Sequence, residues 1–359
     1  MVRHRSVSTF DEFRSLVGEL GPSDVYHSCA YYENPEAEMD RKGWLGADLV
    51  FDIDADHIPT TCNKIHDEWT CNKCGFSGRG VPPEMCPVCS TEKISNKTWP
   101  CEVCLNSAKE ETRKLVDILE KDFGFSADET HLFFSGHRGY HVHVESERLD
   151  ALDSSARREI VDYVCGLGLS ILNPTNAKDS QSFSLTNFGW DRRLRRGIRD
   201  FVRTVSVEEL KALSVKQNYA SILKKKETDR LLADGKWEQI KGVGKETLTT
   251  IAKHVRDLEA AKIDTVVTTD VHRLIRMNGT LHGKTGLRKI EFPLRNLNDF
   301  DPFTEAVAFK DGTAKVFVSS APEFRLGGKV FGPFRSQAVE LPTAAAVLLV
   351  CKGRAEVKE

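Results

Sequence analysis

Hydrophobic and acidic residues alternate in residues 47–57, which read ADLVFDIDADH. The pattern predicts a β-strand that turns Leu49, Phe51 and Ile53 toward the core. Asp52 and Asp54 fall on the opposite face, with Cα atoms about 7 Å apart. A buried strand does not need two neighbouring carboxylates, so this face is a candidate for chemistry.

The rest of the chain mixes helical and strand patterns. The predicted helices span residues 10–20, 107–125, 151–169 and 340–353. Residues 131–145 predict two strands joined by a turn with two glycines, and the final third predicts several short strands. Residues 204–262 are Lys/Glu-rich with helical patterning, which indicates an inserted helical subdomain, and residues 265–283 return to a β-like composition. The mixture indicates an α/β (α+β) protein.

Composition and charge narrow the class of protein. The 359 residues are 40% hydrophobic and 29% charged, which is typical of a globular chain of one to three domains. The net charge is −2, so nucleic-acid binding would have to come from local patches. The longest clean apolar run, AAAVLLVC, is too short to cross a bilayer, and no signal peptide is evident. We therefore expect an intracellular, soluble protein without membrane contact.

The paired acids suggest a metal site. Two carboxylates this close resist joint ionisation, and a divalent cation such as Mg²⁺ or Mn²⁺ removes the repulsion. Asp56 has the same parity, but it lies just before Pro59 and is predicted to be in a loop. The alternative is a pair of solvated acids at a strand end. D-x-D pairs also occur in glycosyltransferases, so the pair indicates metal plus phosphate and no more.

Two further polar clusters could bind phosphate. The turn SGHRGYH, residues 135–141, combines two glycines, which allow close backbone approach, with an arginine suited to phosphate oxygens. Residues 270–284 contain Asp270, Arg273, Arg276, His282 and Lys284, with apolar spacing that suggests one helical turn. The alternatives are an ordinary polar hairpin and a solvated helix face.

Five arginines in residues 192–199 could contact DNA phosphates or form a solvated basic loop, and Trp190 is expected in the core.

Seven of the ten cysteines lie between Cys62 and Cys104. With one histidine they offer eight ligands, enough for two closed tetrahedral Zn²⁺ sites: Cys62, His66, Cys71, Cys74, Cys86, Cys89, Cys101 and Cys104. Sequential pairing would join the first four and the last four. Nested pairing would place the inner four inside a site formed by the outer four. The gaps at 74–86 and 89–101 are equal in length, so spacing does not decide between them.

In order along the chain, the motifs DID, SGHRGYH and D-x₅-R-x₅-H resemble the catalytic small subunit of archaeal and eukaryotic DNA primases, and the resemblance covers nearly the whole chain. It implies that Asp52, Asp54 and Asp270 are the catalytic carboxylates. It also implies nucleotide-binding roles for Ser135, His137, Arg138, His141, Arg276 and His282, and for Arg3 of the RHRS motif. Nesting is favoured for the cysteines, with Cys62, His66, Cys101 and Cys104 in one site and Cys71, Cys74, Cys86 and Cys89 in an inserted ribbon.

The resemblance further implies an archaeo-eukaryotic primase fold: mixed sheets with flanking helices, a zinc-binding module at 58–104 and a catalytic domain formed by 1–203 and 263–359 around the helical insertion at 204–262. The expected activity is template-directed primer synthesis by two-metal nucleotidyl transfer from NTPs or dNTPs on single-stranded DNA. The expected partner is a large subunit that carries an iron–sulfur cluster, in an archaeal cytoplasm near the nucleoid. The family usually has a strand-forming segment before RHRS, so either this sequence starts late or the fold lacks that strand.

Three rival functions are open on the residues alone. A stand-alone primase-polymerase for repair or end joining would not depend on a large subunit. A glycosyltransferase would explain the acids but not the SGHRGYH turn or the Asp270 cluster. A non-catalytic zinc-ribbon protein would leave the acids unexplained and would bind DNA equally well without Mg²⁺.

Overall fold

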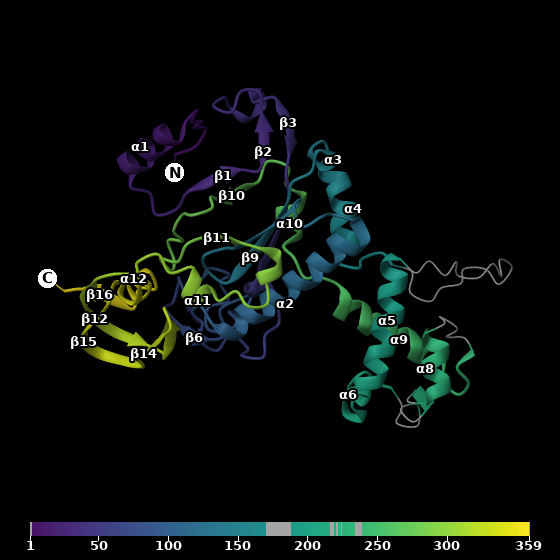
Figure 1. Cartoon of the computed structure of the whole chain (residues 1–359). Helices are drawn as coiled ribbons and strands as arrows, with labels where there is room; N and C mark the ends of the chain where they lie inside the picture. The colour runs from purple at the N-terminus through teal and green to yellow at the C-terminus, as the bar shows by residue number, and fades with distance from the viewer. Residues whose placement is uncertain are drawn as a thin grey trace. The chain divides into compact units, whose positions relative to one another are not determined.

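The structure is a computed structural model that describes residues 2–169, 188–215, 219, 222, 223, 225–233 and 239–358 (Figure 1). The chain divides into two compact units. The first comprises Met1–Arg113, Ser126–Arg158 and Ile263–Glu359, and the second comprises Lys114–Phe125 and Glu159–Lys262. The predicted insertion at 204–262 lies inside the second unit, which also takes in residues N-terminal to it. Helices α2 (Glu102–Ile118) and α4 (Ser154–Val164) continue from one unit into the other.

The first unit is built around a four-stranded antiparallel sheet in the order β11-β8-β9-β4. Its strands are β4 (Leu49–Asp54), β8 (Thr130–Phe134), β9 (Gly139–Val144) and β11 (Ile290–Phe292). The predicted alternation in β4 is confirmed, because Leu49, Phe51 and Ile53 are fully buried. Asp52 lies opposite His141 in the ladder, so both side chains belong to the second face of the sheet.

A small ladder and a short helix adjoin this second face. Strand β1 (Tyr26–Ser28) pairs with β10 (Leu274–Arg276), and Ile275 packs with Cys29 and with Val50 of β4. Helix α10 (Thr265–Thr269) packs against β4, and the backbone N–H of Asp264 donates to the carbonyl of Asp52 (2.8 Å). The helix begins where the Asp264 side chain accepts from Val266 N and Val267 N.

The region from 265 to 283 therefore differs from its prediction. Its Thr/Val-rich start favours strands by composition, but the N-cap at Asp264 makes residues 265–269 helical. The apolar positions at 271–275 were expected on a helical turn. Arg276 instead lies on strand β10, since Ile275 is buried by pairing with β1.

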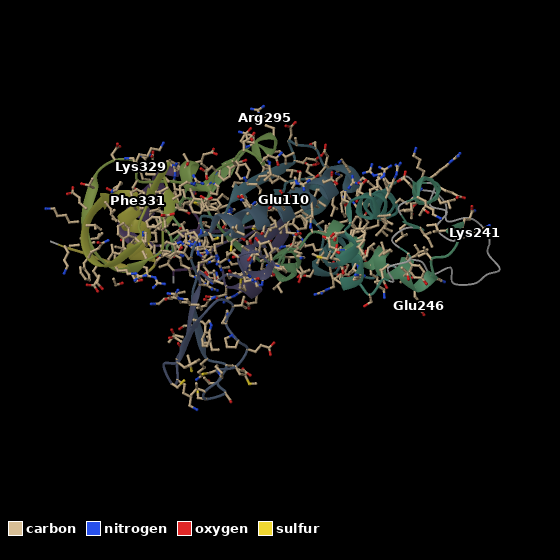
Figure 2. The ribbon with its side chains drawn as sticks, turned by 90° about the horizontal axis from the view of Figure 1, so that it is seen from below. Glu110, Lys241, Glu246, Arg295, Lys329 and Phe331 are labelled. Atoms are coloured by element: carbon tan, nitrogen blue, oxygen red, sulfur yellow. The ribbon has the colours of Figure 1, made fainter. Side chains whose placement is uncertain are left out.

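The cysteine-rich segment forms a separate module within the first unit. Strands β5 (Glu68–Cys71), β6 (Ser77–Arg79) and β7 (Ile94–Lys97) make a three-stranded sheet in the order β6-β5-β7. Figure 2 shows this ribbon extending away from the rest of the unit, with sulfur atoms near its tip. The segment was expected to be metal-held loops, and the structure adds this small sheet between them.

The C-terminal part of the first unit forms two further sheets and a buried helix. Strands β12 (Thr313–Ala321), β15 (Phe334–Pro342) and β16 (Ala355–Val357) form one sheet, and β13 (Phe324–Leu326) pairs with β14 (Lys329–Phe331). Helix α12 (Thr343–Cys351) packs on the larger sheet through Ala345, Leu348 and Leu349. These strands and this helix were predicted from the sequence.

The second unit is helical around its own hydrophobic core. Its main helices are α5 (Gly189–Thr204), α6 (Val207–Ala212), α8 (Lys226–Ala233) and α9 (Lys245–Glu259). Ile198, Val202, Ile251 and Val255 belong to one buried cluster that joins α5 to α9. The arginines of 192–199 thus lie on a helix and not in the loop that one interpretation expected.

The remaining elements are short or peripheral. They are α1 (Phe10–Leu20), β2 (Ala30–Tyr32), β3 (Trp44–Ala47), α3 (Glu147–Asp150), α11 (Pro302–Glu305), the 3₁₀ turns Met39–Arg41, Ala55–His57 and Leu294–Asn296, and the π turn Leu119–Phe123. Helix α1 matches its prediction at both ends. In the described part of the chain, no helix combines the length and hydrophobicity needed to cross a membrane. The mixed helices and sheets confirm the predicted fold class.

Candidate active site and cysteine–histidine sites

Asp52 and Asp54 lie at the end of β4, where the sheet holds them in place. Burial and, to a smaller extent, the neighbouring charges of Asp54 and Asp264 together raise the pKa of Asp52 to about 7. Burial also raises the pKa of Asp54, although the cation of Arg138 opposes the shift. Two carboxylates that are costly to ionise together form a donor set that suits a hard divalent cation.

Asp270 follows helix α10 at its C-terminal end. Its side chain is exposed, and its Oδ1 accepts from the backbone N–H of His272 (2.9 Å). Packing of α10 against β4 brings this segment to the edge of the sheet that carries Asp52. Among the described residues, the oxygens of Asp52, Asp54 and Asp270 do not form a group in which all lie within 4.8 Å of one another. The triad thus remains a prediction, with two members adjacent on one strand.

Cations and imidazoles occupy the sheet face beside Asp52. His141 Nε2 lies 3.6 Å from Asp52 Oδ1, and Lys289 Nζ lies 3.5 Å from His143 Nε2. Lys289 is fully buried, and its ammonium donates to the carbonyl of Arg276 (2.8 Å). Burial lowers the pKa of Lys289 to about 8 and holds the pKa of His141 well below its usual range. Lys289 is thus a buried ammonium without a carboxylate hydrogen bond, and such a group is suited to receive an anion.

The turn between β8 and β9 packs tightly against its neighbours. Ser135 Oγ accepts from the backbone N–H of Gly139 (3.2 Å) and closes the turn. A Cβ on Gly136, which has a φ of 88°, would lie 2.9 Å from the Cβ of His282. A Cβ on Gly139 would clash with the carbonyl oxygen of Ile53. The sequence suggested glycines for ligand approach; the structure adds that both are needed for packing beside β4 and His282.

His137 and His282 stack face to face at this turn. Their ring centroids are 5.0 Å apart with an interplanar angle of 22°. His137 Nε2 lies 3.0 Å from Lys352 Nζ and 3.0 Å from Thr98 Oγ1. Burial lowers the pKa of Lys352 to about 7 and that of His282 to about 3. The structure therefore brings together two of the predicted nucleotide-binding histidines.

The guanidinium of Arg138 is completely buried. Its Nη1 donates to both oxygens of Asp67 (3.0 and 2.7 Å), and its Nη2 contacts Asp56. Asp56 lies in the 3₁₀ turn Ala55–His57, not in an irregular loop. In this structure Arg138 ties together two loops, and its predicted contact with a triphosphate stays a prediction.

Arg276 is also buried and engaged. Its Nη1 donates to Asp24 Oδ1 (2.6 Å) and to the carbonyl of Leu281 (2.8 Å), and its Nη2 donates to Tyr26 Oη (3.0 Å). The N–H of Gly283 shares the same oxygen of Asp24 (3.0 Å), which fixes the loop after His282. Arg3 lies exposed before α1. The nucleotide-binding roles predicted for Arg276 and Arg3 are untested.

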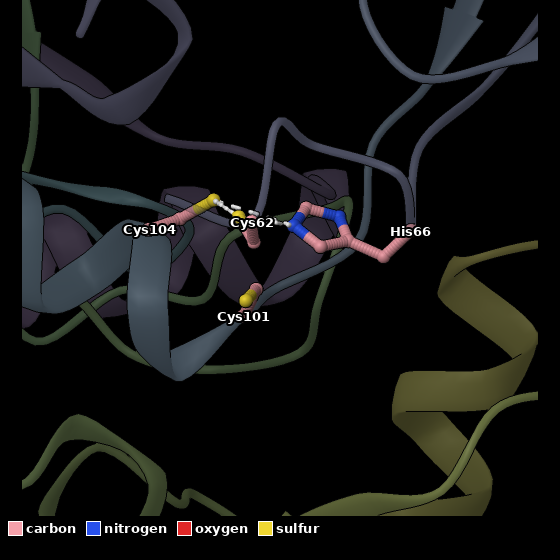
Figure 3. A group of neighbouring side chains, drawn as sticks. All are labelled: Cys62, His66, Cys101 and Cys104. Atoms are coloured by element: carbon pink, nitrogen blue, oxygen red, sulfur yellow. Dashed lines mark hydrogen bonds between the residues drawn. The ribbon is translucent and has the colours of Figure 1, made fainter. Parts of the chain in front are cut away.

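The eight candidate zinc ligands gather as the nested pairing expects. Cys62, His66, Cys101 and Cys104 form one group, and Cys71, Cys74, Cys86 and Cys89 form the other, each with ligand atoms within 4.8 Å of one another. In the outer group His66 Nε2 lies 3.5 Å from Cys62 Sγ and 3.3 Å from Cys104 Sγ (Figure 3). In the inner group two Sγ–Sγ distances are 3.5 and 3.6 Å. With Zn–S bonds of about 2.3 Å, a tetrahedral site places its sulfurs about 3.8 Å apart, so both groups fit Zn²⁺.

Several residues of these sites were not predicted from the sequence. Lys289 and Lys352 are single lysines with no motif, and only the fold brings them to the sheet face and to His137. Asp67 is adjacent to the ligand His66, which is a usable signal, because zinc-bound histidines commonly donate to a carboxylate. Two pockets of about 200 and 220 Å³ occur in the described residues, one lined by His66 and Arg354 and the other by Tyr140 and Asp301, and neither is lined by Asp52, Asp54 or Asp270.

Comparisons with known proteins agree with the sequence resemblance. Residues 88–294 match the family model described as DNA primase small subunit. Proteins named DNA primase small subunit PriS are similar over 99% of this chain: 34% identical in Cenarchaeum symbiosum and 32% in Nitrosopumilus maritimus, each with 88% of the relative covered. The protein of that name from Archaeoglobus fulgidus is 34% identical with 86% covered.

Proposed function

The chain belongs to the DNA primase small-subunit family, and we propose that it is the catalytic subunit of a primase that synthesises short primers of RNA or DNA on single-stranded DNA. The relatives are named as the primase small subunit, which supports a primer-synthesising, nucleotidyltransferase-type enzyme. The family match also sets aside the glycosyltransferase and the non-catalytic zinc-ribbon alternatives.

One observation carries the proposal most strongly. Two half-buried carboxylates with raised pKa values share a sheet face with the ammonium of Lys289 and the imidazole of His141, whose pKa values are lowered. An acidic donor set beside a buried ammonium that has no carboxylate hydrogen bond is complementary to a divalent cation bound to a triphosphate.

The residues would divide the work as follows. Asp52, Asp54 and Asp270 hold Mg²⁺ or Mn²⁺, which would lower the pKa of the attacking 3′-hydroxyl and neutralise the triphosphate. Ser135, His137, Arg138, His141, Arg276 and His282, with Arg3, surround the triphosphate and orient it. Lys289 adds a positive charge from beneath the sheet face. The outer group of three cysteines and His66 and the inner group of four cysteines hold structural Zn²⁺, since each has four protein ligands and no open position.

The name of the relatives implies a large subunit, and we propose a heterodimer with such a partner, together with template DNA and NTPs or dNTPs as substrates. The expected site of action is the replication machinery of an archaeal cell, near the nucleoid. A stand-alone primase-polymerase is the alternative function within the same chemistry.

A template-directed synthesis assay tests the proposal. Purified chain, single-stranded template and Mg²⁺ or Mn²⁺ are incubated with NTPs or with dNTPs, with and without the candidate large subunit. We expect metal-dependent oligonucleotides from the wild type and none from Asp52→Ala, which should unfold at a temperature no lower than the wild type does. Initiation that requires the large subunit supports the replicative role, and full initiation without it supports the stand-alone alternative. Wild-type synthesis by Asp52→Ala would refute the assignment of the site.

A further inference from the structure

We propose that Asp67 is a positioning residue that couples the outer cysteine–histidine group to the carboxylate end of β4, an inference that rests on the proposed zinc and triphosphate sites. In this view the outer zinc does more than hold a loop together. Its loss loosens Arg138 and, through Arg138, the active site. The inner group, in contrast, serves only its own ribbon.

The carboxylate of Asp67 is almost completely buried at 2% exposure and receives three donors. Its Oδ1 accepts from His66 Nδ1 (2.8 Å) and from the backbone N–H of Trp99 (2.8 Å). Its Oδ2 accepts from Arg138 Nη1 (2.7 Å), which also lies 3.0 Å from Oδ1. Oδ1 therefore accepts mainly from His66 and Trp99, which belong to the loops of the outer group, and Oδ2 accepts from Arg138 alone.

Arg138 carries the connection to the active site. Its guanidinium contacts Asp56 on the side opposite Asp67, and its backbone carbonyl accepts from the N–H of Ala55 (3.1 Å). Asp56 N in turn donates to Asp54 Oδ1 (2.9 Å). The segment that follows β4 is therefore fixed by Arg138 at its backbone and at its side chain. A displaced Arg138 would release the turn that orients the Asp54 carboxylate.

His66 provides the connection to the zinc side. Because its Nδ1 donates to Asp67, its Nε2 lone pair points toward Cys62 and Cys104, as a zinc ligand requires (Figure 3). A second contact runs in parallel. Thr98 precedes Trp99, and its hydroxyl lies 3.0 Å from Nε2 of His137 in the phosphate-binding turn. The loops that carry the outer group therefore contact the turn between β8 and β9 at two residues: Asp67 contacts Arg138, and Thr98 contacts His137.

The inner group has no such connection in the described residues. Its cysteines make hydrogen bonds to one another and to the ribbon, through Phe76, Thr91 and Lys73 among others. The two groups therefore differ in a testable way. Removing the outer zinc is expected to weaken triphosphate binding, and removing the inner zinc is not.

The experiment measures zinc affinity by chelator competition and binding of mant-ATP, a fluorescent nucleoside triphosphate, with Mg²⁺. It uses the full chain carrying Asp67→Ala, Asp67→Asn, Cys62→Ser or Cys74→Ser. Glu68→Gln is the matched control, because this adjacent acid pairs with Arg354 (2.8 Å) and not with Arg138. Circular dichroism and thermal midpoints identify any variant that fails to fold. If Asp67→Ala does not fold, the Cys62→Ser and Cys74→Ser pair still decides.

We expect Asp67→Ala to weaken one of two zinc sites by about 10- to 100-fold and mant-ATP binding by about tenfold or more. Asp67→Asn keeps an oxygen for His66 and Trp99 but turns an amide toward Arg138, so it should spare zinc and weaken mant-ATP binding. Cys62→Ser should lower both zinc content and mant-ATP affinity. Cys74→Ser should lose one zinc and keep mant-ATP affinity, and Glu68→Gln should change neither.

Unchanged mant-ATP affinity in Asp67→Ala and Cys62→Ser would overturn the coupling, as would an equal loss in Cys74→Ser. If the wild type binds no mant-ATP, the proposed function fails. The zinc measurement then still tests the inference, since Asp67→Ala without weakened zinc binding would overturn it as well.

Discussion

Charged side chains are buried in both units of this protein, but they are paired in opposite ways. On α5 of the helical unit, Arg193 is 2% exposed and donates to Asp122 (2.6 Å) and Asp117 (2.7 Å). On the sheet face of the first unit, Lys289 is equally buried but donates to a backbone carbonyl. The electrostatic consequences follow the pairing. The acids raise the pKa of Arg193 in spite of its burial, whereas burial lowers that of Lys289 to about 8.

This difference distinguishes a buried charge that stabilises the fold, such as Arg193, from one that is available to bind a ligand, such as Lys289. The arginine-rich stretch at 192–199 was a candidate DNA contact. In the structure these arginines form ion pairs with acids of their own unit: Asp191, Asp117, Asp122, Asp229 and Glu259. A buried cation whose partner is a fixed acid stabilises the fold, because removing one partner leaves the other uncompensated. A buried cation without such a partner is unfavourable until an anion arrives. The predictions below test this distinction.

The largest expected effect concerns the third carboxylate. Asp264 and Asp270 stand at the two ends of α10, which packs against β4, and only the side chain of Asp264 caps the helix; Asp270 ends it through its backbone N–H. Asp270→Asn should lower primer synthesis at least about 1,000-fold, equivalent to roughly 4 kcal/mol of transition-state stabilisation. Asp264→Asn is the control, since asparagine also caps helices and should leave synthesis within about tenfold. The opposite pattern in a template-directed assay would assign the third ligand to Asp264.

The next effect concerns stability of the helical unit. Arg193→Ala leaves Asp117 and Asp122 without their buried cation and should lower the free energy of unfolding by about 3–5 kcal/mol. Arg203→Ala removes a half-exposed partner of Asp229 and should cost less than about 1 kcal/mol. Urea denaturation followed by circular dichroism measures both. Equal losses in the two variants would contradict the view that burial makes the Arg193 pair structural.

Removing the charge of Asp52 should stabilise the protein, in contrast to removing Arg193. Its raised pKa, about 7 in the fold against 3.8 in the unfolded chain, means that the folded state keeps a proton that the unfolded chain has lost. Stability of the metal-free protein therefore falls as pH rises from 4 to 7. Asp52→Asn should raise the free energy of unfolding by about 4 kcal/mol at pH 8 without added Mg²⁺ or Mn²⁺ and by almost nothing at pH 4. A destabilised variant at pH 8 would show that the acid is structural.

The smallest effect is expected for the exposed arginines of α5. Arg196 pairs with Glu259 (3.0 Å) and Arg199 with Asp229 (2.9 Å), so their charges are largely neutralised within the unit. Arg196→Gln and Arg199→Gln should change affinity for single-stranded DNA by less than about twofold, with an unchanged salt dependence. Fluorescence anisotropy over a salt series measures this. A decrease of about one in the slope of log affinity against log salt concentration would show that α5 contacts DNA after all.

Residues that obey a local pattern could be predicted from the sequence. The alternation in β4 placed Asp52 on the face opposite the core, and the clustered cysteines identified the candidate zinc ligands. The zinc pairing itself needed the resemblance or the fold, because the two gaps are equal. The segment 265–276 was misread, since a single cap at Asp264 outweighed β-like composition. Lys289 and Lys352 carry no sequence signal of their own and reach these sites only through packing, whereas Asp67 is marked only by its position beside His66.

The central claim is that the carboxylates and the unpaired cations of one sheet face bind a metal–triphosphate complex together. Isothermal titration calorimetry of ATP into the zinc-loaded wild type and into Asp52→Asn, each with Mg²⁺ and without added Mg²⁺, tests it directly. We predict that Mg²⁺ strengthens ATP binding to the wild type at least about tenfold, because the cation neutralises Asp52 and Asp54, and that Asp52→Asn loses this dependence. Equal affinities with and without Mg²⁺ in the wild type would contradict the claim.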